Sequence, residues 1–427
     1  MTTVPTSAEP VRIALIGAGN RAQTEYAPLI SSLRPWAQLV VVCDPVKANC
    51  DALAARLGVP AVYDIRKLVT EVKPEAALIV TPVESHHSIS IYLSSHGIHN
   101  MTETTWASTV LQTKDMIATA RRHNVIVRVG ENFYRFPPDR FAQTLKTSGY
   151  LGRIGRIFSY ADHTGYHNNS RWIRFAGAHP QWVQCLEHSM AHPAFYSMPQ
   201  RRHTEENLNA RFFGFADGFL VMDTGSGHVK GHLGRHPRPG YTEWQGERGT
   251  LMYRAGGHEW GSDLDFELRY CSDAKFAAQQ EASGQLTGGG LADQVTPVVM
   301  EMDGAHWVRS YANTPSGVIE YVNPYRPLDT GARPYDWYGA AIMGHIVDFV
   351  LAACGLRASE FSAEDALMSE MMEVGARESA LNEGKRIRLP VEGDLETDAL
   401  TLAALRKRYG VDPLDVEAML AISYPRP

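Results

Sequence analysis

The chain has 427 residues, which is long enough for two or three domains with a substantial core. With 44% hydrophobic residues, 21% charged residues and a formal net charge of -6, its composition is that of an ordinary soluble globular protein and argues against a nucleic-acid partner. Five widely spaced cysteines without a C-x-x-C pair give no indication of a disulfide framework or a zinc site, so no metal is expected.

The N-terminal segment, MTTVPTSAEP, lacks the basic and apolar regions of a secretion signal. No apolar run in the sequence reaches the roughly 20 residues needed to cross a bilayer. We therefore expect a cytoplasmic protein without a membrane partner.

Residues 11–22, VRIALIGAGNRA, combine an apolar run, a glycine turn and the start of a helix-like stretch. Gly17 allows the sharp turn, Gly19 leaves room for phosphate oxygens, and the small Ala22 lets helix and strand pack closely. Backbone amides at such a turn bind a pyrophosphate together with the N-terminus of the following helix. The pattern predicts a dinucleotide site, and the alternative is a glycine turn in some other α/β protein.

An acid follows the second apolar run of the chain, residues 39–43. Asp44 at this position is expected to accept hydrogen bonds from both ribose hydroxyls of NAD and to repel the 2′-phosphate of NADP. The sequence therefore predicts NAD as the cofactor.

From residue 11 to about residue 129, apolar runs alternate with helical patterns. Runs at 76–80, 99–101 and 125–129 continue the alternation, which predicts a parallel sheet with helices on both faces. Ligands of such sheets lie at the carboxyl ends of the strands. We therefore assign residues 1–130 to an α/β Rossmann domain that binds NAD.

The second half of the chain differs, because short strands follow one another with turns and few helices. We expect residues 131–390 to form an α+β domain with a large, mostly antiparallel open sheet. Residues 272–293 are expected to form a long surface loop. Residues 391–427 are expected to be a C-terminal extension with short helices, either a surface tail or an oligomerisation arm.

Several motifs follow one another in a recognisable order. They are the glycine turn with Asp44, a T-P-x-x-x-H segment at 81–86, an acid at Glu103 and an N-x-Y-R-F-x-P segment at 132–138. Together they resemble the Gfo/Idh/MocA family of nicotinamide-dependent sugar and polyol oxidoreductases. The resemblance covers residues 11 to 390, so an enzyme of this type is expected.

The resemblance implies contacts with cofactor, substrate and other subunits. In the family, a sheet of the kind expected for residues 131–390 lies below the nicotinamide and commonly meets another subunit. A sugar or glycoside substrate and a homo-oligomer, either dimer or tetramer, are therefore expected. Glu103 has an alternative role as an acid that favours a helix N-terminus. The residues expected to bind the cofactor are Gly17, Gly19, Asn20, Arg21, Asp44, Thr81, Pro82, His86, Glu103, Thr104 and Asn132.

The catalytic positions of the family are only partly kept. The family's proton-exchanging lysine, in an E-K-P segment, is replaced here by Thr104, which has no pKa near neutrality. The family's D-x-x-x-H pair matches His188 and His192, which we expect on one face of a helix at 181–192. The proton is therefore expected to pass through His192, His188 or Tyr134. A metal site or two solvated histidines are the alternatives for the pair.

Two further segments carry candidates for substrate binding. Arg135 follows a strand and is expected either to face the substrate or to form a salt bridge at the domain junction. Residues 163–175, HTGYHNNSRWIRF, are expected to form a loop that stacks on a sugar bearing a carboxylate, sulfonate or phosphate, with surface packing as the alternative. The candidates in this loop are His163, Tyr166, Arg171, Trp172 and Arg174.

Three functions are open at this point. The first is an NAD-dependent oxidoreductase that transfers hydride between a sugar ring hydroxyl carbon and nicotinamide. The second, suggested by the missing lysine, is an NAD-dependent glycoside hydrolase that oxidises a ring hydroxyl, eliminates the aglycone, adds water and returns the hydride. The third is an NAD-binding sensor that has lost catalysis.

Overall fold

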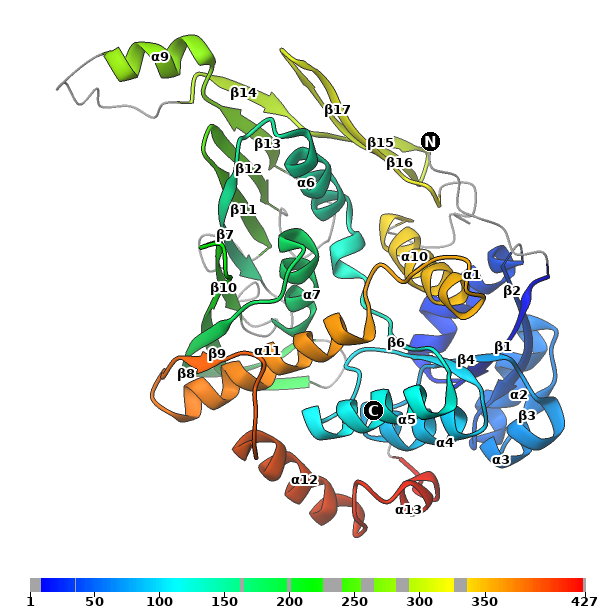
Figure 1. Cartoon of the computed structure of the whole chain (residues 1–427). Helices are drawn as coiled ribbons and strands as arrows, with labels where there is room; N and C mark the ends of the chain where they lie inside the picture. Colours follow the sequence, from blue (N-terminus) through cyan, green and yellow to red (C-terminus); the bar gives the residue numbers. More distant parts are fainter. Residues whose placement is uncertain are drawn as a thin grey trace. The chain divides into compact units, whose positions relative to one another are not determined.

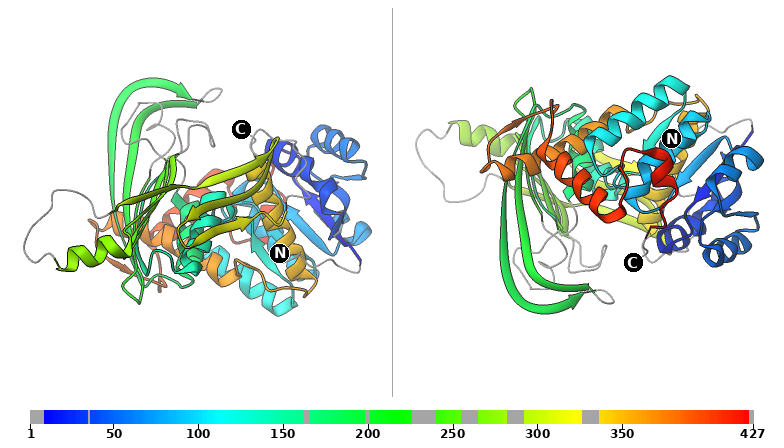
Figure 2. Two further views of the ribbon diagram at one scale, coloured as in Figure 1. Left: turned by 90° about the horizontal axis from the view of Figure 1, so that it is seen from above. Right: turned by 90° about the horizontal axis from the view of Figure 1, so that it is seen from below.

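The computed structural model describes residues 9–34, 36–161, 165–197, 201–225, 240–254, 265–281, 292–325 and 336–424. Two units divide the chain (Figures 1 and 2). The first consists of Met1–Phe133, Pro324–Val374 and Glu392–Pro427, and the second of Tyr134–Asn323 and Gly375–Val391. Each unit therefore combines segments that lie far apart in the sequence.

The first unit contains a six-stranded sheet in the order β3-β2-β1-β4-β5-β6, in which every neighbouring pair is parallel. The predicted Rossmann sheet is thus confirmed. The direction of strand addition reverses between β1 and β4, which is where sheets of this type bind ligands. The strands are β1 (Val11–Ile16), β2 (Ala37–Cys43), β3 (Ala61–Val62), β4 (Ala76–Ile79), β5 (His99–Thr102) and β6 (Val127–Val129).

Helices connect and cover these strands (Figure 1). Two of the elements, η5 (Phe133–Arg135) and α11 (Ala363–Leu381), contribute residues to both units. The others that precede residue 354 in the first unit are η1 (Ala22–Tyr26), α1 (Ala27–Ile30), η2 (Ser31–Leu33), α2 (Lys47–Leu57), α3 (Ile65–Lys67), η3 (Leu68–Val72), η4 (Val83–Ser85), α4 (His86–Ser95), α5 (Val110–His123) and α10 (Asp336–Ala353).

Both faces of the six-stranded sheet are covered, which explains why its strands are continuous apolar runs. On one face, Ile346 of α10 belongs to the same buried core as Leu15 of β1. On the other, Leu93 of α4 belongs to a second core with Ile16. Helix α10 therefore belongs to the first unit, although it follows the nine-stranded sheet of the second unit in the sequence.

The C-terminal residues pack against the first unit as α12 (Glu396–Tyr409) and α13 (Val416–Leu420). Met419 of α13 is buried, and α13 lies against α4. Arg408 forms an ion pair with Glu84 at 2.9 Å. The expectation of a surface tail was wrong, because these helices bury apolar side chains. Within the described part of the chain, no helix combines the length and apolarity required to span a membrane.

The second unit contains a nine-stranded sheet in the order β14-β13-β12-β11-β7-β10-β9-β8-β18. Only its β7–β10 pair is parallel within the described residues, so the prediction of a large, mostly antiparallel sheet is confirmed. The strands are β7 (Ile154–Ala161), β8 (Trp182–Ser197), β9 (Arg201–Gly214), β10 (Leu220–Gly225), β11 (Tyr241–Gly246), β12 (Gly249–Arg254), β13 (Asp265–Tyr270), β14 (Gln294–Pro297) and β18 (Ile387–Arg388).

Within the described residues, three helices that lie wholly in the second unit and a smaller sheet complete it. The sheet contains β15 (Val299–Asp303), β16 (His306–Thr314) and β17 (Gly317–Val322), and the helices are α6 (Pro137–Ser148), α7 (Gly165–Ala176) and α9 (Asp273–Glu281). The loop expected at 272–293 begins instead with α9, whose first turn is capped where Ser272 Oγ accepts a hydrogen bond from Lys275 N. Residues 282–291 of that expected loop lie outside the described residues.

The helix expected at residues 181–192 is wrong, because these residues belong to strand β8. Val183 and Cys185 are buried in alternation and pair with Phe213 and Arg211 of β9, which is a period of two rather than 3.6. Figure 2 shows β8 and β9 as one long curved ribbon. The four-residue spacing that suggested a helical pair is therefore spread along a strand.

Candidate functional site

The glycine turn follows β1 at the reversal of strand order. Gly17 has a φ of +101°, and a Cβ added there would lie 2.3 Å from the carbonyl oxygen of Val80, so only glycine fits. A Cβ added at Gly19 would meet no heavy atom of the described residues within 4 Å. The turn is thus closed on its sheet side and open at Gly19, as the pyrophosphate prediction requires.

Asp44, at the end of β2, is buried and holds the turn in place. Its Oδ2 accepts a hydrogen bond of 2.7 Å from the backbone N–H of Ala18, and its Oδ1 accepts one of 2.7 Å from that of Val46. The predicted ribose acceptor therefore lies directly beside the glycine turn and is oriented by backbone donors.

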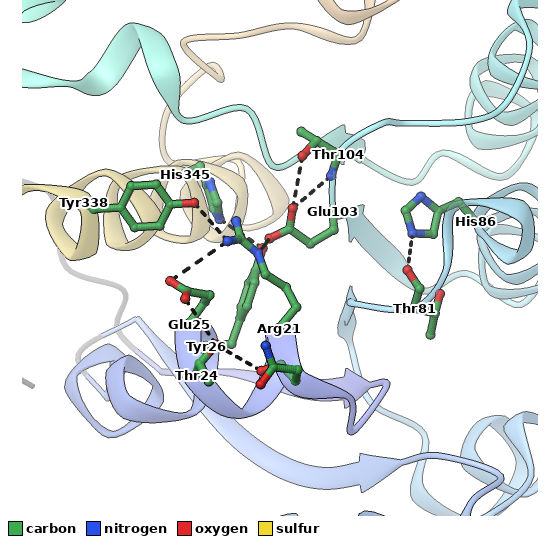
Figure 3. Close-up of polar contacts among 11 residues, drawn as sticks. Arg21, Thr24, Glu25, Tyr26, Thr81, His86, Glu103, Thr104, Tyr338 and His345 are labelled. Atoms are coloured by element: carbon green, nitrogen blue, oxygen red, sulfur yellow. Dashed lines mark hydrogen bonds and ion pairs between the residues drawn. The ribbon is translucent and has the colours of Figure 1, made fainter. Parts of the chain in front are cut away.

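His86 joins the segments that follow β4 and β5. Its Nε2 lies 2.9 Å from the carbonyl oxygen of Thr81 (Figure 3). Its Nδ1 lies 2.9 Å from the carbonyl oxygen of Thr105. Burial lowers the pKa of His86, so the neutral ring donates to one of these carbonyls at a time. The ring thereby fixes the position of the Glu103–Thr105 segment relative to Thr81.

Glu103 is surrounded by hydrogen-bond donors (Figure 3). Its Oε1 accepts bonds of 2.8 Å from Arg21 Nε and from the Tyr26 hydroxyl. Its Oε2 accepts bonds from the backbone N–H and the hydroxyl of Thr104, at 2.9 and 3.2 Å. Burial alone would raise the pKa of Glu103, but the charges of Arg21 and His345 and these bonds outweigh it and lower the pKa to about 2. Glu103 is therefore a permanent, fully engaged anion.

Helix α10 supplies two residues of this network that sequence reasoning missed. The Tyr338 hydroxyl accepts a 2.9 Å bond from Arg21 Nη1, and Nε2 of His345 lies 3.3 Å from the Tyr26 hydroxyl oxygen. The available signal was a polar imidazole in the otherwise apolar stretch AAIMGHIV. Because α10 is more than 200 residues from β5 in sequence, that signal did not indicate a partner.

The remaining residues predicted to bind the cofactor lie at the same end of the sheet. Asn20 is exposed at the glycine turn, whereas Asn132 is buried after β6. Arg21 is engaged with Glu103 and Tyr338. Pro82 precedes η4 in extended conformation. Together with Thr81, His86 and Thr104, these residues border the carboxyl ends of β1, β4, β5 and β6.

In the second unit, residues 165–176 form α7 rather than the expected loop. Arg171 donates to Asp139 at 2.9 Å and to Thr242 Oγ1 at 3.1 Å. Trp172 is fully buried, and its Nε1 donates to Asp223 Oδ2 at 3.2 Å. Both side chains therefore anchor α7 on its neighbours, which is why this polar stretch is helical. His163 lies outside the described residues.

His167 on α7 is a third residue that sequence reasoning missed. Its ring is buried and lies 4.1 Å from the ring of Tyr166, centroid to centroid. It follows His163 by four residues, the same spacing as His188 and His192, but here the second histidine is on a helix. The signal for this pair was therefore present in the sequence, at a position that had been assigned to a loop.

His188 and His192 are not brought together as a helical pair. In a regular strand, four residues span about 13 Å. His188 is exposed, and Nδ1 of His192 lies 2.8 Å from the carbonyl oxygen of Pro193. Their assignment to a helix face is thus corrected.

Three arginine side chains surround the ring of Tyr134. Its ring centroid lies 4.7 Å from the guanidinium carbon of Arg135, 5.5 Å from that of Arg140 and 5.8 Å from that of Arg174. Tyr134 and Arg135 are both buried. Three guanidinium groups therefore lie within 6 Å of one aromatic ring, where cation–π attraction stabilises them. In the described residues, no group of three His, Cys, Asp or Glu side chains could hold a metal ion.

A parallel sheet with an open glycine turn at its strand reversal defines a Rossmann-type nucleotide-binding unit. Residues 11–131 match the oxidoreductase family with an NAD-binding Rossmann fold that is named Gfo/Idh/MocA. The resemblance seen in the sequence is thereby confirmed for residues 11–131, which match this family.

Two curated relatives and one solved structure describe the similarity further. D-glucoside 3-dehydrogenase of Escherichia coli (strain K12) is 31% identical over 152 residues, which are 35% of this chain and 42% of the relative. 2,7-anhydro-N-acetylneuraminate hydratase of Mediterraneibacter gnavus is 24% identical over 156 residues, which are 36% of this chain and 39% of the relative. The chain thus matches about two fifths of the length of these relatives.

The solved structure is levoglucosan dehydrogenase in complex with NADH and levoglucosan. It superposes with a TM-score of 0.61 at 17% identity, covering 90% of this chain and 100% of that one. The likeness extends through both units and shows a shared fold.

Proposed function

We propose that this protein is an NAD-dependent oxidoreductase that transfers hydride between the carbon of a sugar ring hydroxyl and nicotinamide. The observation that carries the proposal is the glycine turn, open at Gly19 and held by Asp44 at the reversal of strand order. A D-glucoside dehydrogenase among the relatives and a levoglucosan dehydrogenase with the same fold support a carbohydrate substrate.

The residues present fit a dinucleotide, because the open turn would accommodate phosphate oxygens and the Asp44 carboxylate would face ribose hydroxyls. Bound NAD would supply the acceptor for the hydride. Arg21 and Glu103 would act indirectly, since they bind each other. The residues proposed to hold the cofactor are Gly17, Gly19, Asn20, Asp44, Thr81, Pro82, His86 and Asn132. Thr104, at the position of the family's lysine, is proposed to contact the substrate.

We propose His167, rather than His188 or His192, as the imidazole that exchanges the proton of the substrate hydroxyl. It lies on a helix held by the buried Arg171 and Trp172, and an anchored ring is what general acid–base catalysis needs. Tyr134 is the second candidate. The guanidinium groups around Tyr134 support a substrate that carries a carboxylate, sulfonate or phosphate.

The test is incubation of the purified protein with NAD and a panel of methyl glucosides, inositols, levoglucosan and uronic acids, with NADH absorbance as the readout. We expect NADH to accumulate with at least one of them. His167→Asn should lower kcat at least 100-fold and leave NADH affinity within 2-fold, whereas the exposed His123→Asn should change neither. If the protein binds NADH but turns over no sugar of the panel, the proposed oxidoreductase activity is contradicted.

A cycle of oxidation, elimination, hydration and reduction without net redox change is the second candidate function. Thr104 in place of the lysine and a hydratase among the relatives favour it. Such an enzyme would release the aglycone from a nitrophenyl glycoside, or hydrate an unsaturated sugar, with catalytic rather than stoichiometric NAD. Binding of NAD with neither reaction would favour a sensor.

We also propose a homo-oligomer, a dimer or tetramer, assembled through the second unit. Large apolar side chains are exposed on β8, with Leu186 at 58% and Tyr196 at 68% of their full accessibility. A two-stranded ribbon with such side chains is more stable when another surface covers it. Light scattering of the wild type and of Leu186→Glu would test this, with a smaller mass expected for the variant.

A further inference from the structure

A chain of hydrogen bonds connects residue 104 to a buried imidazole in the first unit (Figure 3). The Thr104 hydroxyl lies 3.2 Å from Oε2 of Glu103, and the Tyr26 hydroxyl lies 2.8 Å from Oε1 of the same carboxylate. Nε2 of His345 lies 3.3 Å from the Tyr26 oxygen. Three elements thus contribute to it: the segment after β5, η1 and α10.

We propose that Tyr26 and His345 are positioning residues, which act through Glu103 to orient Thr104 for its contact with substrate. The inference rests on the proposed function for its catalytic consequence. It goes beyond that function because it assigns a role to two residues that the proposed function leaves unused.

The direction of each bond follows from the donors available. The single hydrogen of the Tyr26 hydroxyl points to Glu103, which is an anion. The Tyr26 oxygen can then only accept from His345, so Nε2 of His345 carries a hydrogen. The arrangement defines one protonation pattern: His345 donates to Tyr26, and Tyr26 donates to Glu103.

Packing holds this pair in one place. A Cβ added at Gly130, after β6, would lie 3.3 Å from Cε1 of His345 and 3.4 Å from both the Tyr26 hydroxyl and the carbonyl oxygen of Thr102. Tyr26 has no exposed surface, and His345 has almost none. The two side chains are therefore seated against the carboxyl ends of β5 and β6, with little freedom to adopt another geometry.

The consequence is an oriented hydroxyl at the position of the family's lysine. Because the Thr104 hydroxyl donates to Glu103, its oxygen is presented as a hydrogen-bond acceptor, whereas a lysine ammonium group is only a donor. An acceptor at this place favours the hydroxyl form of a substrate over its ketone. Among the described residues, the charged and titratable groups that act on Tyr26 include Glu103, Arg21 and Tyr338, and His345 acts on Glu103.

The first experiment measures amide hydrogen exchange at Thr104 in the cofactor-free protein, because this N–H donates to Glu103 at 2.9 Å. We expect Tyr26→Phe and His345→Leu to speed its exchange at least 10-fold. His345→Gln, whose amide nitrogen can replace the Nε2–H donor, should restore the wild-type rate. Tyr409→Phe, which removes a hydroxyl bonded to Glu84, and His87→Gln, which removes a buried imidazole on α4, are matched controls.

The second experiment measures kcat and KM with the best sugar of the panel. Tyr26→Phe should lower kcat at least 10-fold with KM for NAD unchanged, and should have no further effect in a Thr104→Val background, because both changes act on one hydroxyl. Additive losses, or unchanged exchange at Thr104 in both Tyr26→Phe and His345→Leu, would overturn the proposal. Faster exchange in a protein that turns over no sugar would support the positioning role and contradict only the proposed function.

Discussion

Asp398, near the C-terminus, caps the helix that begins at Val110. Its two carboxylate oxygens accept hydrogen bonds from the backbone N–H groups of Val110 and Leu111, at 3.2 and 3.0 Å. These N–H groups belong to the first turn of α5, where a negative charge is favoured by the helix dipole. This first turn of α5 comes a few residues after Glu103 and Thr104 in the chain. The hydrogen bonds from Asp398 therefore hold the end of the segment that carries these two residues.

We expect Asp398→Ala to lower the free energy of unfolding by about 1–2 kcal/mol, because it leaves two helix N–H groups without their acceptor. Urea unfolding followed by circular dichroism measures this. Asp394→Ala, at an exposed position before α12, is the control and should change stability by less than about 0.5 kcal/mol. Equal stability of the two variants would show that the cap contributes nothing.

The two glycines of the turn should respond differently to alanine. Gly17→Ala places a Cβ against the carbonyl of Val80 at a positive φ, so we expect a loss of about 2–4 kcal/mol of stability. Gly19→Ala meets no described atom, so stability should be unchanged while NADH affinity falls at least 10-fold. Thermal unfolding and NADH fluorescence titration measure the two effects. An alanine at position 19 that leaves NADH affinity intact would contradict the pyrophosphate site.

Asp44 offers a matched pair of substitutions. Asp44→Asn keeps one oxygen, which can accept from Ala18 N–H, but it loses the acceptor for Val46 N–H and the charge that repels a 2′-phosphate. We expect its preference for NADH over NADPH to fall at least 10-fold, with a smaller loss of stability than in Asp44→Ala. Asp44→Ala should lose the preference and destabilise the turn as well. The Kd values of both dinucleotides decide this, and an unchanged ratio in Asp44→Asn would argue against NAD as the natural cofactor.

Glu370, on α11, is a half-buried acid that forms hydrogen bonds with the backbone of Trp106 and Ala107. Burial raises its pKa most, and the carboxylates of Glu373 and Glu131 raise it further, to about 8, although the amides of Ala107 and Trp106 partly oppose this. The unfolded chain releases this proton near pH 4.5, so the folded state loses stability as the pH rises from about 4.5 to about 8.

Glu370→Gln removes this proton linkage and can still accept from the two amides. We therefore compare the free energies of unfolding of Glu370→Gln and the wild type. The difference, variant minus wild type, should increase by about 2–3 kcal/mol from pH 5 to pH 8. Urea unfolding at both pH values gives the difference. The exposed Glu392→Gln is the control, and a stability difference independent of pH would contradict a buried, protonated carboxyl group.

The sequence alone was sufficient for the features that are local along the chain. The sequence predicts strands β1, β2 and β4 because residues buried on both faces of a sheet must be apolar. It predicts the turn at Gly17 because glycine allows a sharp turn directly after a strand. Asp44 followed from its place at a strand end. These assignments depend on neighbours within a few residues, which a sequence displays directly.

Tertiary structure decided the features that depend on partners far away in the chain. Tyr338 and His345 join the hydrogen-bond network only because α10 places them beside Arg21 and Tyr26. These partners lie more than 300 residues earlier in the sequence. The sequence predicts a helix where β8 lies, because the alternation of buried residues in this strand depends on its pairing with β9. The sequence predicts that Arg171 and Trp172 bind substrate from a loop. In the structure they are buried and anchor a helix, and this helix also carries His167. Burial and pairing across long sequence separations do not leave a local pattern, so only the folded chain shows them.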